Sequence, residues 1–400
     1  MTSSTLAGSI GGMTGKRARD HGIPFSGVPG PLNAITDVPG VEVGYTTLWE
    51  GEGRLEVGKG PVRTGVTAIL PRGRDSLSPC FGAWASLNHA GEMTGTIWLD
   101  ERGLVEGPVL ITNTHQVGVV RDAAISWVRR RGNDTVFLVP VVAETFDGLL
   151  HDIDGGHIRP DHVFAALDGA RSGPIAEGSV GGGTGMMTFE YKAGTGTASR
   201  VLPAEQGGYT VGVLVQSNFG ARHSLRLGGV KVGERLLDDK PRPLDPDLIP
   251  PEHAGLYARW LGTDDDTRQP TPNEAGDGSI IVVVATDAPL LPHQLKRVAK
   301  RPALGIGRLG GVGTALSGDI FLALSTANGG VSETGDPQPI DHFPNLNLSP
   351  MFEAVIDATE EAIVNAMVAA EAMEGANRFY VPALPVERVC AILKEHGQRR

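Results

Sequence analysis

The stretch GDGSIIVVVATDAPL, residues 276–290, decides the fold class. At its centre five β-branched residues, from Ile280 to Val284, follow directly after Gly278 and Ser279. An apolar run of this length between turn residues predicts a strand that is covered on both faces. Two interpretations of its start are open. It is either an ordinary junction between a loop and a strand, or a cut between Gly278 and Ser279 that makes Ser279 a new amino terminus.

Further strands and helices are predicted around this run. Apolar runs predict strands at 66–70, 109–112, 135–142, 211–216, 279–285 and 320–325. Helical periodicity predicts helices at 121–130, 161–169, 292–300, 350–374 and 386–395, with Asp161 as an N-cap and Gly375 as a stop. Neither strict βαβ alternation nor an all-β pattern fits. We therefore expect one layered α/β (α+β) sandwich with its helices outside, formed by residues 1–400.

Residues 238–278 differ in composition from the rest of the chain. They contain seven prolines and an acidic triplet at 264–266, and we expect a linker with one short helix at 252–261. Loops of this length inside a compact domain are usually functional or disordered. This one ends where the buried strand begins.

Composition narrows the class of protein. The net charge of −11 argues against binding to nucleic acid or to an anionic membrane. The two cysteines, Cys80 and Cys390, have no metal or disulfide spacing and are expected to be buried, and we expect no metal and no cofactor. No signal peptide or membrane-spanning segment is recognisable, so we expect a cytoplasmic protein.

A serine at a chain start carries its own candidate base. Its hydroxyl is a weak nucleophile that needs a base within reach, and a free α-amine has a pKa of about 7.7 to 8.0, against about 10.4 for a lysine. Before the cut, the Ser279 hydroxyl could attack the Gly278 carbonyl in an N-to-O acyl shift. A glycine at 278 tolerates the strained backbone that this step needs.

Several other motifs have a catalytic and a structural interpretation. GGGTGMM (181–187) suggests a phosphate loop, but no Walker lysine follows and tight packing is favoured. HDIDGGH (151–157) offers metal ligands but fits no known metal motif, which favours a hydrogen-bonded turn. His89 and Glu92 could form an acid–base pair or line a pocket or a subunit interface, and His115 is expected to be a satisfied polar residue.

Eight motifs together carry a resemblance that extends from about residue 17 to residue 390. They are NAITDVPGVEVGYTT (33–47), TGVTAILPRG (64–73), VVAETFDGLLHDIDGGH (141–157), GGGTGMM (181–187), VQSNFG (215–220), GSIIVVVATDAPLLPHQLKRVAKR (278–301), ALSGDIFLALSTAN (315–328) and DATEEAIVNAM (357–367). In this order they resemble the DmpA-type family of L-aminopeptidase/D-esterase/amidases, which includes the β-peptidyl aminopeptidases.

The resemblance implies a fold and a maturation step. The fold is a four-layer αββα sandwich, similar to the N-terminal nucleophile hydrolases but with different strand connectivity. The precursor would cut itself between Gly278 and Ser279 into an α chain, 1–278, and a β chain, 279–400. Ser279 would then be the nucleophile, and the mature protein would be a homo-oligomer, a tetramer of αβ units.

The resemblance also implies roles for the other site residues. Ser317 would hydrogen-bond Ser279 and pass protons, and Asp319 would orient the group. Asn218 would stabilise the oxyanion, and Glu144 would pair with the free amine of the substrate. The substrates would be short peptides, amides or esters.

This chain departs from the family pattern at three places. Phe146 stands where relatives often have Tyr, His151 stands where Asn is expected, and the segment before Ser279 is longer. These departures affect the expected substrate preference more than the reaction class. Two other functions stay open: an acyltransferase resembling the glutamate N-acetyltransferases, which use Thr as nucleophile, and a non-catalytic oligomeric binding relative.

Overall fold

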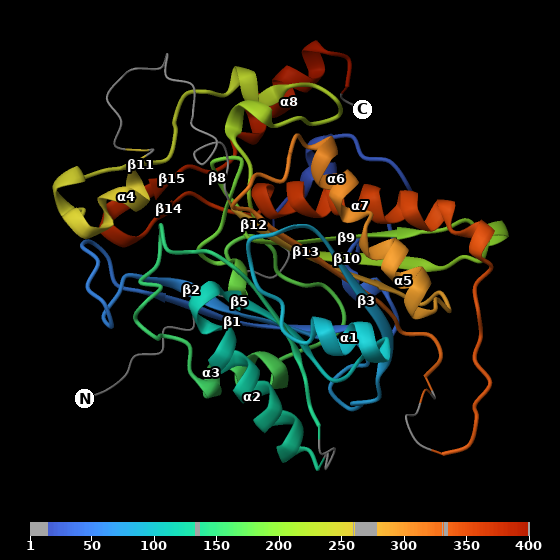
Figure 1. Ribbon diagram of the computed structural model, residues 1–400. Helices are drawn as coiled ribbons and strands as arrows, with labels where there is room; N and C mark the ends of the chain where they lie inside the picture. The colour runs from blue at the N-terminus through green and yellow to red at the C-terminus, as the bar shows by residue number, and fades with distance from the viewer. Residues whose placement is uncertain are drawn as a thin grey trace.

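The computed structural model describes residues 15–132, 137–258, 260, 278–329, 331 and 335–398. Two sheets form its centre (Figure 1). The six-stranded sheet has the order β4-β3-β13-β12-β10-β9 and consists of β3 (Cys80–His89), β4 (Leu104–Val105), β9 (Thr195–Val201), β10 (Thr210–Asn218), β12 (Ser279–Thr286) and β13 (Gly318–Ser325). The four-stranded sheet has the order β1-β2-β5-β6 and consists of β1 (Glu42–Glu50), β2 (Val62–Leu70), β5 (Val109–Asn113) and β6 (Val141–Thr145).

The remaining elements surround these sheets. Two small sheets contain β7 (Met187–Thr188) with β8 (Tyr191–Lys192), and β11 (Arg242–Pro243) with β15 (Phe379–Val381) and β14 (Met373–Glu374). The helices are α1 (Thr96–Arg102), α2 (Val117–Arg130), α3 (Pro160–Asp168), α4 (Ala254–Tyr257), α5 (Pro292–Ala299), α6 (Pro302–Arg308), α7 (Ser349–Val368) and α8 (Val386–Glu395). None of the helices in the described ranges has the length and apolar character needed to cross a lipid bilayer.

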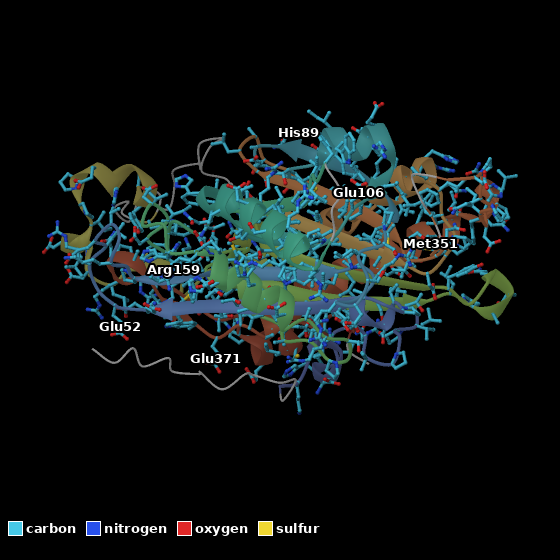
Figure 2. All side chains as sticks on the ribbon, turned by 90° about the horizontal axis from the view of Figure 1, so that it is seen from below. Glu52, His89, Glu106, Arg159, Met351 and Glu371 are labelled. Carbon is cyan, nitrogen blue, oxygen red and sulfur yellow. The ribbon has the colours of Figure 1, made fainter. Side chains whose placement is uncertain are left out.

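Three apolar cores hold four layers together. Figure 2 shows the side chains from below, along the direction in which the layers are stacked, with α2 (teal) and α3 (green) in front. The middle core lies between the sheets, with Ile69 and Ile111 from the smaller sheet and Ile281 and Leu322 from the larger. Helices α2 and α3 cover the outer face of the four-stranded sheet, and α5, α6 and α7 cover the six-stranded one (Figure 1). The expected four-layer αββα sandwich is therefore confirmed.

Strand β12 occupies the centre of the larger sheet because all of its residues are apolar or small enough to be buried. Each of its eight residues is buried, as predicted from the β-branched run. It pairs in parallel with β13, where Ser279 is in register with Gly318, and antiparallel with β10, where Ser279 faces Asn218. This register brings the start of β12 to the end of β10.

The strand predicted at 66–70 begins at Val62, and the helix predicted at 121–130 begins at Val117. Three further predicted boundaries were wrong for a visible physical reason. The helix predicted at 350–374 ends at Val368, because Met373 pairs with Val381 in a small sheet instead of continuing the helix, so Gly375 is not its stop. The strand predicted at 135–142 begins at Val141, directly after Pro140, which lacks the N–H that a ladder needs; Thr135 lies outside the described residues. The N-cap of α3 is Arg159 and not Asp161, because Pro160 takes the first helical position.

The first part of the predicted linker is folded against the body. Arg242 and Pro243 pair with β15, and the expected short helix is the single turn α4. Tyr257 of this turn is fully buried and donates its hydroxyl hydrogen to the carbonyl of Leu149 at 3.2 Å. Residues 261–277, where the rest of the expected linker falls, lie outside the described residues.

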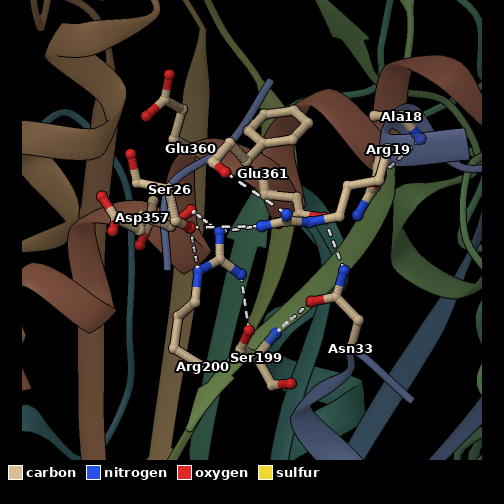
Figure 3. A network of polar contacts seen from close by, with 12 residues as sticks. Ala18, Arg19, Ser26, Asn33, Ser199, Arg200, Asp357, Glu360 and Glu361 are labelled. Carbon is tan, nitrogen blue, oxygen red and sulfur yellow. Dashed lines mark hydrogen bonds and ion pairs between the residues drawn. The ribbon is translucent and has the colours of Figure 1, made fainter. Parts of the chain in front are cut away.

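A buried polar network joins the N-terminal segment to α7 (Figure 3). The carboxylate of Glu361 accepts hydrogen bonds from Arg19 at 2.8 Å and from Asn33 at 2.6 Å, and forms an ion pair with Arg200 at 2.8 Å. Each charge is therefore paired, as a buried ion must be to remain charged. Arg200 also donates to the carbonyl of Asp357. The network connects β9 and the N-terminal segment to the same face of α7.

Candidate active site

One cavity of about 690 Å³ contains most of the predicted site residues. Its wall includes Gly278, Ser279, Asn218, Glu144 and Phe146, which come from segments far apart in the sequence. Ser317 and Asp319 are not among the lining residues; they are buried directly after Leu316, which does line the cavity. A cavity of this size can hold a short peptide or an amino-acid amide.

Gly278 and Ser279 are held tightly at the start of β12. The carbonyl oxygen of Gly278 accepts a hydrogen bond from the N–H of Gly318 at 3.0 Å. A Cβ on Gly278 would lie 1.9 Å from the carbonyl oxygen of Asn218, so only glycine fits at this position. Ser279 is 4% exposed, and its hydroxyl makes no hydrogen bond to any part of the chain that the structure describes. This hydroxyl is therefore not already committed to a structural contact.

Asn218 ends β10 on the same side of the sheet as Ser279. Its Oδ1 accepts from the N–H of Met187 at 2.9 Å, and its Nδ2 donates to the carbonyl of Phe146 at 2.8 Å. These two bonds fix which end of the amide carries the N–H groups. The second Nδ2 hydrogen has no acceptor within the described ranges, so it can donate to a ligand in the cavity.

Glu144 is a buried carboxylate with two donors. Its Oε2 accepts from the Thr114 hydroxyl, and its Oε1 accepts from the N–H of Glu92 at 2.8 Å. Gly91 permits this approach, because a Cβ there would lie 2.8 Å from Oε1. Burial raises the pKa of Glu144 above its usual range, and the hydrogen bonds from Thr114 and Glu92 partly offset this. A cation that enters the cavity could form an ion pair with this carboxylate, which lines the cavity wall.

Ser317 and Asp319 form a pair of their own. The Ser317 hydroxyl donates to Oδ1 of Asp319 at 2.7 Å, and both side chains are almost fully buried. Burial raises the pKa of Asp319 to about 6, while the bond from Ser317 acts in the opposite direction. The predicted hydrogen bond between Ser317 and Ser279 is not present among the described residues. The two serines instead belong to neighbouring strand ends, because Ser279 is in register with Gly318.

The alternative motifs have structural roles in this fold. The N–H groups of Gly181 and Gly182 donate to the hydroxyls of Thr47 and Thr67, so they are not directed at a phosphate. The expected packing role is confirmed, because a Cβ on Gly182 would lie 2.2 Å from Oε1 of Gln216.

The HDIDGGH segment is the hydrogen-bonded turn that was expected. His157 contacts Asp152 at 2.8 Å, and His115 contacts Asp154 at 2.8 Å. Burial lowers the pKa of His151 to about 3, and its neutral ring accepts from the N–H of Arg63. The described residues contain no group of three or more His, Cys, Asp or Glu side chains arranged to hold a metal ion. The stretch around His89 contributes Ala90 and Gly91 to the cavity, while His89 itself contacts Ser86.

Two contributors to the site were not predicted. Gly318 supplies the backbone donor to Gly278, and its only signal is its position between Ser317 and Asp319. Lys192 is fully buried beside Met186 and Met187, next to the cavity, and no sequence motif singles it out.

Comparisons with known proteins show similarity along most of the chain. The model of peptidase family S58 matches residues 33–380. The chain is 53% identical over 384 residues to the β-peptidyl aminopeptidase BapA of Sphingosinicella microcystinivorans, covering 96% of this chain and 93% of the relative. The resemblance inferred from the eight motifs is confirmed.

Solved structures are similar over the same length. The L-aminopeptidase D-Ala-esterase/amidase of Ochrobactrum anthropi, described as a variant of the Ntn hydrolase fold, superposes with a TM-score of 0.83 at 43% identity and covers 96% of this chain and 99% of that one. A β-aminopeptidase of a Burkholderia species gives a TM-score of 0.82 at 43% identity, with 96% and 100% covered.

Proposed function

Because the chain belongs to peptidase family S58, we propose that it is a serine aminopeptidase/amidase that activates itself by cutting the bond between Gly278 and Ser279. One observation carries the proposal. Ser279, Asn218 and Glu144 line a single cavity, and the carbonyl of Gly278 lies at the same place, held by the N–H of Gly318. The peptidase match also favours hydrolysis over the acyltransferase alternative.

Self-cleavage would use the residues in their observed positions. The Oγ of Ser279 attacks the carbonyl carbon of Gly278, and the oxygen that becomes negative already accepts from Gly318. The C–N bond then breaks, the nitrogen takes up the hydroxyl proton, and an ester joins the two residues. Water hydrolyses this ester, which leaves a carboxylate on Gly278 and restores the hydroxyl of Ser279 beside its new α-amine.

Catalysis would repeat this attack on a substrate. The α-amine of Ser279, which exists only after the cut, is the proposed base, with a reference pKa of about 7.7 to 8.0. Asn218 is the proposed oxyanion donor, and Ser317 with Asp319 forms the proposed proton-transfer and orienting pair behind the cavity wall. The acyl-enzyme ester is then hydrolysed by water.

The proposed substrates carry a free amino terminus. The buried Glu144 carboxylate would pair with this ammonium, while apolar side chains such as Leu256, Trp260 and Phe146 would surround the remainder. The names of the β-peptidyl aminopeptidases support short peptides that begin with a β-amino acid, and the name of the Ochrobactrum anthropi enzyme supports amino-acid amides and esters. The proposed mature enzyme is a cytoplasmic tetramer of αβ units.

The proposal is tested by comparing matched substrates. A p-nitroanilide of a β-amino acid and its N-acetylated form are incubated with the wild type and with Ser279→Ala. We expect the wild type to release p-nitroaniline from the substrate with a free amine and not from the N-acetylated one. We expect Ser279→Ala to release it from neither. Equal release from both substrates would remove the role proposed for Glu144, and no release from any amine substrate would contradict the aminopeptidase activity.

A further inference from the structure

Lys192 is a buried cation without a carboxylate partner. Its side chain is fully buried, and no acidic group pairs with it in the described ranges. Its Nζ instead donates to two backbone carbonyls, that of Met186 at 2.9 Å and that of Ala193 at 2.7 Å. A lone buried ammonium is costly for a fold, and a residue retained in this state needs an explanation. Burial also lowers the pKa of Lys192 to about 7, so the ammonium form predominates only below about pH 7, and only this form can polarise the carbonyls by its charge.

The position of Lys192 connects it to the oxyanion donor. The Met186 carbonyl that it contacts belongs to the peptide whose N–H, on Met187, donates to Oδ1 of Asn218 at 2.9 Å. A series of hydrogen bonds therefore connects the Lys192 ammonium, through one peptide group, to the Asn218 amide. Asn218 lines the same cavity as Ser279.

Each bond in this series strengthens the next. A cation at a carbonyl oxygen draws electron density from the peptide, which makes its N–H a stronger donor. A stronger donor at Oδ1 in turn withdraws density from the side-chain amide and makes its Nδ2 hydrogens more positive. The effect is largest in a site that excludes water.

We propose that Lys192 is a positioning residue of this site, which polarises the Met186–Met187 peptide and so strengthens Asn218 as the donor to the oxyanion. This inference rests on the proposed function and adds a residue that acts only through Asn218. The same peptide fixes the orientation of the amide, because the N–H of Met187 donates to Oδ1 and Nδ2 is left to donate to the Phe146 carbonyl and to a ligand.

The test separates an electronic role from a structural one. Lys192→Met keeps the unbranched apolar stem, one atom shorter, and removes the charge and the donors. Because the oxyanion forms only in the transition state, we expect kcat to fall about tenfold, less than the 10²–10³ for loss of a direct donor, with KM within about twofold. Lys192→Gln, which keeps a donor without the charge, serves if Lys192→Met does not fold.

Arg63→Met is the matched control. Arg63 is also a buried cation that donates to backbone carbonyls, those of Glu50, Gly51, Val62 and Glu374, but none of these peptides contacts Asn218. Its removal is expected to lower the melting temperature and to leave kcat within about twofold.

A double-mutant cycle with Asn218→Ala identifies the route. If Lys192 acts through Asn218, Lys192→Met changes kcat by less than about twofold once the amide is gone. An unchanged kcat in the single variant, or the same tenfold fall in both backgrounds, would overturn the proposal. A wild type that hydrolyses no amine substrate would instead contradict the proposed function, and with it this inference.

Discussion

The backbone N–H of Gly318 donates to the carbonyl oxygen of Gly278, so the start of β13 holds the carbonyl that Ser279 is proposed to attack. The contact is built into the parallel register, which sets Ser279 opposite Gly318. A donor that is in place before the reaction costs no reorganisation when charge develops on the oxygen. Folding of the two strands would therefore also prepare the cleavage.

The first prediction concerns this cleavage. The purified wild type is expected to consist of two chains, one ending at Gly278 and one of the 122 residues from 279 to 400. Ser279→Ala lacks the attacking oxygen and should remain a single chain of 400 residues. Intact-mass spectrometry of both proteins decides the question, and a cut at the same bond in the variant would contradict self-processing.

Gly278→Ala should block the same step for a different reason. The added Cβ would lie 1.9 Å from the Asn218 carbonyl, so the chain has to shift and the carbonyl leaves its position at Gly318. We expect cleavage to slow at least about 100-fold, as misplacement of a reacting group by about 1 Å does. Gly307→Ala, in a helix with open space around it, is the control and should be cut at the wild-type rate. The time course of the two products on a gel measures both.

Glu144→Gln should remove recognition of the substrate amine. The amide keeps the shape of the side chain but lacks the charge, and loss of one partner from a buried charge pair costs about 2–5 kcal/mol. We expect kcat/KM for free-amine substrates to fall on the order of 100-fold. Glu92→Gln is the control, since it keeps the backbone N–H that donates to Glu144 and removes only the charge of an exposed side chain, which acts on Glu144 through space. A normal kcat/KM in Glu144→Gln would contradict the assignment.

The pH dependence of that recognition follows from burial. Because burial raises the pKa of Glu144, the carboxylate takes up a proton at a higher pH than an exposed glutamate does. The affinity for an ammonium substrate should therefore decline as the pH falls, and 1/KM should show an acid limb. Glu144→Gln should lack this limb, which a KM profile between pH 4 and 8 can establish.

Asp319 should make the fold less stable at high pH. Its pKa is about 6 in the folded state against 3.8 for the ordinary carboxyl, so the folded state binds more protons between these values. The free energy of unfolding therefore decreases as the pH rises through this window, by up to about 3 kcal/mol in total. Asp319→Asn should not show this decrease. Its free energy of unfolding, relative to that of the protein with Asp319, should therefore increase from pH 4 to pH 8.

Urea unfolding at both pH values measures the effect. Both proteins carry Ser279→Ala, so that neither is cut during the measurement. A stability difference that stays constant between pH 4 and pH 8 would contradict the raised pKa. In the protein that keeps Ser279, Asp319→Asn is expected to raise stability at pH 8 and to lower activity, because residues of functional sites often reduce stability.

The parts of the fold that the sequence predicts are those set by local pattern. The β-branched run at 280–284 is apolar on both faces, which is enough to place β12 at the centre of a sheet. The end of α7 could not be predicted, since apolar spacing continues to Met373 and only the pairing with Val381 shows that the chain has become a strand. Tertiary contacts decide such boundaries.

The residues of the candidate site likewise include some that local sequence motifs indicate and some that they do not. The motifs indicate Ser279, Asn218 and Glu144, which line the cavity, but not the backbone donor of Gly318 or the buried Lys192. A lysine in a sequence is normally expected at the surface. The two carbonyls that hold its Nζ, those of Met186 and Ala193, belong to the same β7–β8 hairpin as Lys192. The sequence does not show that this hairpin packs against the end of β10, where Met187 contacts Asn218.

Strands β12 and β13, which follow the proposed cut, lie between β3 and β10, which precede it. After a cut, unfolding of this sheet would therefore also separate two polypeptides. Arg19, Asn33 and Arg200 then belong to one polypeptide and Glu361 to the other. Denaturation becomes dissociation, and reassembly becomes a second-order reaction whose rate depends on the concentration of both fragments. An uncut chain would refold as one molecule, whereas the two chains of the proposed mature enzyme would separate when they are diluted in denaturant. The lifetime of that enzyme is then set by the rate of opening and not by an equilibrium.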